Sequence, residues 1–148
     1  MGCAIEFDAR GVVLEAGDLS LDWPEIARRV GINLIGIHKP EEGMPTFAKT
    51  ITGSDFMERC AGYGIAVETE IHALSRLLPR GYFTENPEWF RVDQWTGRRV
   101  ADFNLCPSSA EGVGTAARAA AEWAAQVPST SGRFYFWPDD NRAWCHCE

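Results

Sequence analysis

The sequence has no excess of basic residues: 14 Lys and Arg stand against 21 Asp and Glu, which gives a net charge of −7. Proteins that bind nucleic acid draw much of their affinity from basic side chains on phosphates, so we expect no nucleic-acid partner. The sequence also lacks an apolar run near the ~20 residues that cross a bilayer. Its first ten residues lack the basic stretch and apolar run of a secretion signal. We therefore predict no membrane partner and a cytoplasmic location.

The cysteines are odd in number and mostly isolated, which is typical of a reducing compartment rather than of a disulfide scaffold. The five cysteines are Cys3, Cys60, Cys106, Cys145 and Cys147. Only Cys145, His146 and Cys147 are clustered, and their soft ligand atoms make zinc a candidate cofactor at these three residues. Tetrahedral zinc sites normally have four ligands, so Cys106 or a residue of another chain would have to complete the set. Buried thiols without a metal are the alternative.

What the sequence does contain is an alternation of short apolar runs with helical patterns, which is typical of a parallel α/β sheet. The expected strands cover residues 11–16, 32–38, 65–72 and 133–137, and the expected helices cover 22–30, 54–63 and 108–127. Asp22 is placed to cap the first helix, and Ser108 with Glu111 has the spacing of a capping box for the third. Gly31 and residues 62–64 are the expected stop signals of the first two helices.

This repeat of strand and helix predicts a partial (β/α)8 barrel, or TIM barrel, of about four strands within a single domain of 148 residues. A complete barrel needs ~250 residues, so the chain supplies only about half of one. A small open doubly wound sheet is the alternative. Residues 73–107 form the one long connection, which we expect to be a lid or binding loop because its aromatic side chains argue against disorder.

Ionisable side chains interrupt the expected strands, although strands of a parallel sheet are normally apolar on both faces. In residues 65–72 the alternation of side chains puts Glu68, Glu70 and His72 on one face. Comparable residues lie near the ends of the other expected strands: Glu15, Asp18, His38, Asp139 and Asp140. Ligands of barrels and open sheets bind at the carboxyl ends of the strands, so these residues are predicted to converge at one site. Solvated charges, turn caps or a core histidine are the plain structural alternatives.

The segment after the fourth expected strand combines aromatic, acidic and amide side chains, because Trp137 and Trp144 flank Asp139, Asp140 and Asn141. Sugar rings pack their C–H faces on aromatic rings, while their hydroxyls bond carboxylates and amides. Carbohydrate is therefore the expected partner.

Residues 137–147 have the sequence Trp-Pro-Asp-Asp-Asn-Arg-Ala-Trp-Cys-His-Cys. This segment resembles an uncharacterised bacterial domain family that is grouped with glycoside-hydrolase-like barrels. The family is similar in architecture to α-glucuronidases and β-hexosaminidases. Five further segments match in the same order: 11–15, 33–38, 70–72, 86–89 and 104–107. The resemblance implies a barrel whose first strand is 11–15 and whose fourth ends at Trp137. Members of the family look longer, with a further cysteine soon after the Cys-x-Cys and the remaining strands after it. The chain would then be the N-terminal half of a barrel, completed by a second copy or by its missing half.

Most glycosidases use two carboxyl groups, a general acid and a nucleophile or base. Asp139 or Asp140 is the predicted general acid, and Glu70 is the internal candidate for the second carboxylate. The resemblance to hexosaminidase-like barrels implies an alternative in which the acid and its helper both follow the fourth strand, and the acetamido group of the substrate replaces the nucleophile. The predicted sugar-binding residues are Glu15, His38, His72, Asn104, Trp137, Asn141 and Trp144.

Two other functions remain open. A metal-dependent sugar isomerase or hydrolase would take its ligands from the strand ends, namely Glu15, His38, Glu70, His72 and Asp139. A carbohydrate-binding or assembly module would bind sugar without turning it over. Bound divalent metal would favour the first, and sugar binding without turnover would favour the second.

Overall fold

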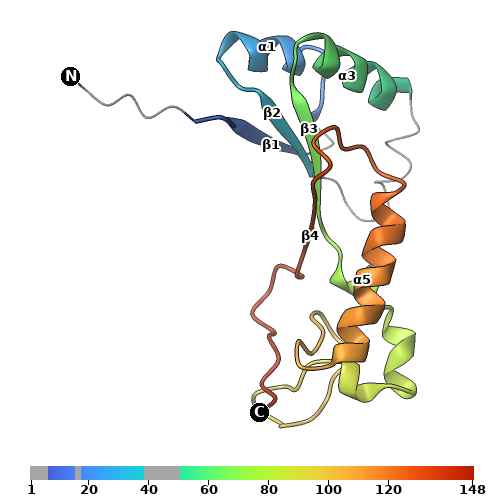
Figure 1. Ribbon diagram of the computed structural model, residues 1–148. Helices are drawn as coiled ribbons and strands as arrows, with labels where there is room; N and C mark the ends of the chain where they lie inside the picture. Colours follow the sequence, from blue (N-terminus) through green and yellow to red (C-terminus); the bar gives the residue numbers. More distant parts are fainter. Residues whose placement is uncertain (1–6, 16–17, 39–50) are drawn as a thin grey trace, which may run out of the picture. The chain divides into compact units, whose positions relative to one another are not determined.

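The computed structural model describes residues 7–15, 18–38 and 51–148. Its four strands form one sheet in sequential order, with β1 paired parallel to β2 and β2 parallel to β3 (Figure 1). The strands are β1 (Gly11–Glu15), β2 (Leu34–His38), β3 (Ala66–His72) and β4 (Phe134–Trp137). The predicted parallel α/β sheet is therefore confirmed, with strand starts shifted by at most two residues. Ala16, the expected last residue of the first strand, lies outside the described residues.

Three longer helices separate the strands: α1 (Trp23–Arg29), α3 (Ile51–Gly62) and α5 (Ala110–Ala124). The first two end at the predicted glycines, because Gly31 and Gly64 have φ of 78° and 69°. In each case the next residue turns back onto the helix. The amide of Ile32 donates to the carbonyl of Ala27 at 2.8 Å, and that of Ile65 donates to the carbonyl of Cys60 at 2.9 Å. These tight stops explain why β2 and β3 follow their helices so closely.

The predicted helix caps were wrong in detail. The side chain of Asp22 makes no capping hydrogen bond to α1. At α5 the cap is Ser109, whose side chain accepts from the amide of Gly112 at 3.3 Å, so Glu111 lies one residue too early for a capping box. Ser108 is not the cap, and its hydroxyl accepts a hydrogen bond from the thiol of Cys147 at 3.4 Å instead.

One face of the sheet is covered by α1 and α3. Its apolar side chains are buried together with side chains of both helices: Leu14, Ala27, Ile35, Ile37, Phe56, Cys60, Ile65 and Val67. The opposite face alternates with them along each strand and carries Val13, Gly36, Glu68 and Glu70. Val13 is 54% exposed, so the described residues do not cover this face near β1. We call it the open face.

The chain forms two compact units. The first consists of Met1–Glu70 and Val127–Tyr135, and the second consists of Ile71–Gln126 and Phe136–Glu148. The single domain expected from chain length stays a prediction.

The second unit contains the whole of the expected long connection, residues 73–107, which is more structured than the sequence pattern indicates. It holds the short helices α4 (Leu74–Leu77), η2 (Arg80–Thr84) and η3 (Pro87–Trp89). Two isolated antiparallel bridges follow, Phe90 with Leu105 and Val92 with Arg99.

Alanine substitutions of two glycines in α5, Gly112 and Gly114, are expected to change the stability of the protein in opposite directions. A Cβ at Gly112 would lie 2.9 Å from the Cβ of Trp89, whereas a Cβ at Gly114 would meet only Arg118 at 3.6 Å. We expect Gly112→Ala to lower the free energy of unfolding by about 1–3 kcal/mol because of overpacking. We expect Gly114→Ala to raise it by about 0.5–1 kcal/mol through helix propensity. Urea unfolding of both variants measures the difference, and equal changes would contradict the close packing of α5 on η3.

Candidate functional site

The register of the first unit brings three predicted site residues into one row. Glu15 pairs with His38 across β1 and β2, and His38 pairs with Glu70 across β2 and β3. In-register residues of neighbouring strands project to the same side, which here is the open face. Exposure falls along the row: Glu15 is exposed, His38 is half-buried and Glu70 is 6% exposed. The row lies at the carboxyl ends of the strands, where parallel sheets bind ligands.

Glu70 is the carboxyl group with a perturbed pKa in this row. Burial raises the pKa of Glu70, His38 lowers it and Glu68 raises it further, so that the pKa stays above its ordinary value. Glu68 is also buried, but it has close partners of its own: Ser131 donates to it at 2.9 Å, and Arg133 lies 3.4 Å away. The two carboxyl groups therefore differ in their surroundings: burial shifts the pKa of Glu70 upward, whereas Glu68 is held by Ser131 and Arg133.

Gly36 leaves the space that the Glu70 side chain occupies. A Cβ at Gly36 would clash with Oε1 of Glu70, so any larger residue would displace the carboxyl group. Gly36 sits in the middle of β2 and is buried. The sequence offers a signal here, because a glycine inside a strand often marks the close approach of another group.

The second unit brings His72 and Trp137 together at the ends of β3 and β4. Their ring centroids are 5.2 Å apart in an edge-to-face arrangement. Nδ1 of His72 lies 2.6 Å from the carbonyl of Pro138, to which it donates. Trp137 is 37% exposed, so part of its ring faces solvent.

Asp139 forms an ion pair and hydrogen bonds with other residues of the second unit. Its Oδ2 lies 3.4 Å from Nη2 of Arg80, and its Oδ1 accepts from the amide of Ser75 at 3.4 Å. Its backbone amide donates to Oδ1 of Asn104 at 2.8 Å. These partners favour a role for Asp139 in positioning the segment rather than in proton transfer. Nothing in the sequence pointed to Arg80, which lies 59 residues before Asp139.

The remaining predicted residues of this segment lie nearer the surface. Asp140 is exposed and Trp144 is 52% exposed. Asn141 forms a turn in which its Oδ1 accepts from the amide of Ala143 at 2.7 Å. In the first unit Asp18 lies outside the row, and its carbonyl accepts from the indole of Trp23 at 2.9 Å.

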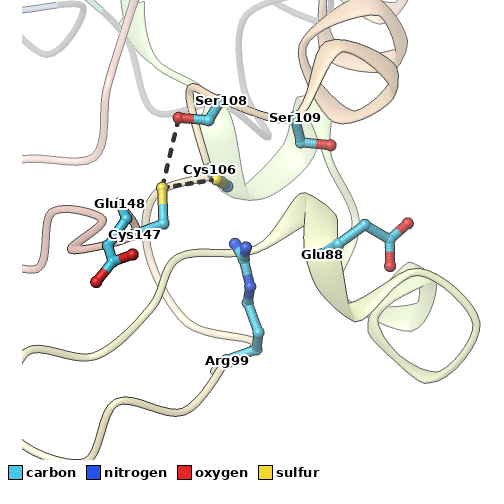
Figure 2. A pocket seen from close by; sticks show the side chains of 7 residues that line it. All are labelled: Glu88, Arg99, Cys106, Ser108, Ser109, Cys147 and Glu148. Atoms are coloured by element: carbon cyan, nitrogen blue, oxygen red, sulfur yellow. Dashed lines mark hydrogen bonds between the residues drawn. The ribbon is translucent and has the colours of Figure 1, made fainter.

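Three cysteines of the second unit form a cluster at metal-binding distance. The sulfur atoms of Cys106, Cys145 and Cys147 all lie within 4.8 Å of one another, and Figure 2 shows two of them, Cys106 and Cys147. Cys106 and Cys147 are 3.4 Å apart, and the amide of Val92 donates to the sulfur of Cys145 at 3.2 Å. Cys106, a residue expected to complete the set, belongs to this group, whereas His146 is exposed and is not part of it.

The electrostatics of the cluster favour a thiolate at one position. Burial raises the pKa of Cys106, but hydrogen bonds from Arg99, Cys147 and the Ser108 amide bring it down to about 7. Burial raises the pKa of Cys145. Figure 2 shows Arg99 pointing toward Cys106 and Cys147. These residues line a cavity of about 200 Å³. The cavity is lined by Glu88, Arg99, Cys106, Ser108, Ser109, Cys147 and Glu148.

Among the residues that the structure describes, the cysteine cluster is the only group of three His, Cys, Asp or Glu side chains close enough to share one metal ion. The expected hard-metal ligands of the strand ends do not form such a group. No described helix has the length and apolar character needed to cross a membrane.

Comparisons with protein-family models, curated proteins and solved structures give no match to this chain. The family resemblance drawn from the sequence motifs therefore stays a prediction.

Proposed function

We propose that the chain is a carbohydrate-active, glycoside-hydrolase-like domain in which Glu70 is the general acid. The observation that carries the proposal is the state of Glu70: a carboxyl group with a raised pKa, buried at the end of a parallel strand on the open face. A general acid must hold its proton near the working pH, and burial is how glycosidases achieve this. Asp139, one of the two general acids expected from sequence beside Asp140, is proposed here as a positioning residue because Arg80 and Asn104 hold it.

The strand order supports a partial (β/α)8 barrel. When neighbouring parallel strands follow one another in sequence, right-handed crossovers place the connecting helices on the same face of the sheet. The strands here are in sequential order, and α1 and α3 both pack on one face. A doubly wound sheet reverses its order and carries helices on both faces. The open face then corresponds to the barrel interior. A second copy, or the second half of a longer chain, would cover it.

Sugar contacts in the second unit are proposed for the exposed side chains after β4. Trp137 and Trp144 offer aromatic surface, and Asp140 and Asn141 offer oxygen and amide groups beside it. His72 and Asn104 act through the backbone and ring contacts that hold this segment. Glu15 and His38 are proposed to contact substrate in the row of Glu70.

Zinc is the metal proposed for the cysteine cluster. Thiolates are soft ligands that select zinc over hard cations, and three sulfur atoms already lie at the required separation. Such a site needs reduced thiols, which supports the proposed cytoplasmic location.

Two other functions fit less well. A hard-metal isomerase requires convergent carboxylate and imidazole ligands, which the described strand ends do not provide. A non-catalytic carbohydrate-binding module explains the exposed tryptophans, but it gives no role to the buried acid of β3.

A panel of aryl glycosides, assayed with the purified chain alongside light scattering and sugar titrations followed by NMR, tests the proposal. We expect turnover of one glycoside class by a dimeric or otherwise completed species. Saturable sugar binding without turnover would favour the binding module. Neither binding nor turnover in a compact monomer would contradict both.

A further inference from the structure

We propose that metal binding at the cysteine cluster fixes residues 138–148 onto the loop 90–106, and so sets the positions of Asp140 and Trp144. The inference rests on the zinc site proposed above and adds a function for it: the ion organises the segment that carries the proposed sugar contacts.

Residues 138–148 contain no helix or strand. Near its start the segment is held through Asn104, which is 2% exposed. Oδ1 of Asn104 accepts from the amide of Asp139 at 2.8 Å, and its Nδ2 donates to the carbonyl of Ala143 at 3.4 Å. Near its end the segment meets Val92, whose carbonyl accepts from the amide of His146 at 3.1 Å and whose amide donates to the sulfur of Cys145.

The loop 90–106, which the segment contacts, is held in place by hydrogen bonds of its own. Arg91 binds Asp102 through two hydrogen bonds of 2.6 and 2.7 Å, and the amide of Cys106 donates to the carbonyl of Trp89 at 2.8 Å. Asn104 and Cys106 therefore lie close together in a part of the loop that hydrogen bonds hold in place. Asn104 already binds the start of the segment. A metal that joins Cys106 to Cys145 and Cys147 would bind the end of the segment to the loop as well.

Without metal, the far end is held by the backbone hydrogen bond from His146 to Val92 and by contacts of the cysteine thiols, which are weak hydrogen-bond donors and acceptors. Between the two ends, residues 140–144 make short-range turn hydrogen bonds and a 3.4 Å contact with the loop, from Nδ2 of Asn104 to the carbonyl of Ala143. Restraining both ends reduces the conformations open to these residues. Metal–thiolate bonds supply the restraint that the thiol contacts lack.

The test compares the metal-free, reduced protein with the protein loaded with Zn²⁺ or with Co²⁺, whose absorption reports thiolate ligands. Trypsin cleavage after the exposed Arg142 measures opening of the segment, and cleavage after the exposed Arg29 of α1 serves as the internal reference. With free metal at about ten times its Kd, we expect cleavage after Arg142 to slow about tenfold relative to Arg29.

Two variants separate the ligands from their neighbours. We expect His146→Ala to keep the thiolate–cobalt absorption and the protection of Arg142. We expect Cys106→Ser to lose one thiolate from the spectrum and the protection with it. If Cys106→Ser fails to fold, the comparison of metal-free and metal-loaded wild type still decides the proposal.

The outcomes are distinct. Cobalt–thiolate absorption with unchanged cleavage after Arg142 would overturn the inference and leave the zinc site standing. Absence of that absorption would overturn the zinc site and the inference together. Neither result bears on the glycosidase proposal, which the aryl glycosides test separately.

Discussion

Replacement of Glu70 by glutamine is expected to lower kcat about 100- to 10,000-fold on the glycoside that the wild type cleaves, the usual contribution of a general acid. Glutamine keeps the size and hydrogen-bonding capacity of the side chain but holds no proton to transfer. KM should change little, because the loss falls on the transition state. Glu68→Gln is the matched control, since Glu68 lies on the same strand face and is equally buried but binds Ser131 and Arg133. Equal losses of kcat in both variants would contradict the assignment.

The raised pKa of Glu70 also predicts a pH dependence of stability. Because the folded state holds the Glu70 proton to higher pH than the unfolded state, the folded state binds more protons in that window. The free energy of unfolding therefore falls as pH rises from 4.5, the ordinary pKa value, through the raised folded value. The stabilising contribution is complete below this window and lost above it. In Glu70→Gln this slope should disappear, which urea unfolding between pH 4 and 8 measures.

The first unit shows what a sequence of this kind can predict. Period-two alternation placed Glu68 and Glu70 on one face, and the sequence placed Glu15 and His38 at strand ends. The register that aligns Glu15, His38 and Glu70 in one row comes from the pairing of the strands in the structure. Local rules cannot predict which carboxyl group is held by a distant side chain and which has a pKa raised by burial. Glu68 and Glu70 look identical in the sequence, and only partners that lie 63 residues away, such as Ser131, distinguish them.

The second unit was harder to predict because its contacts are long-range and irregular. Cys106 and Cys147 are 41 residues apart, and the pattern of the chain favoured the neighbouring His146 as a ligand. The capping box failed for a similar reason: Ser108 has the right spacing, but its hydroxyl is engaged by Cys147, and Ser109 caps the helix. Side chains that bond across a fold override local preferences, and no spacing rule reveals which ones do.

Asp102→Ala is expected to cause a large loss of stability for a charged residue of the loop 90–106. Arg91 has a side chain that is 7% exposed, and Asp102 binds it at both Nε and Nη2. Removing Asp102 leaves a buried guanidinium with only the longer contact to Asp93, 3.3 Å away. We expect the free energy of unfolding to fall by about 2–3 kcal/mol, below the 3–5 kcal/mol typical of a fully buried pair, because the Asp102 side chain is 40% exposed.

The control for this prediction is Asp140→Ala, which removes an exposed carboxylate of the same unit and should leave stability essentially unchanged. Urea unfolding of both variants measures the difference in midpoint. The same loop carries Asn104 and Cys106, so Asp102→Ala should also weaken cobalt binding and lose protection of Arg142 in metal-loaded protein. A variant that loses stability but keeps full metal affinity would mean that the cysteine cluster forms independently of the Arg91–Asp102 pair.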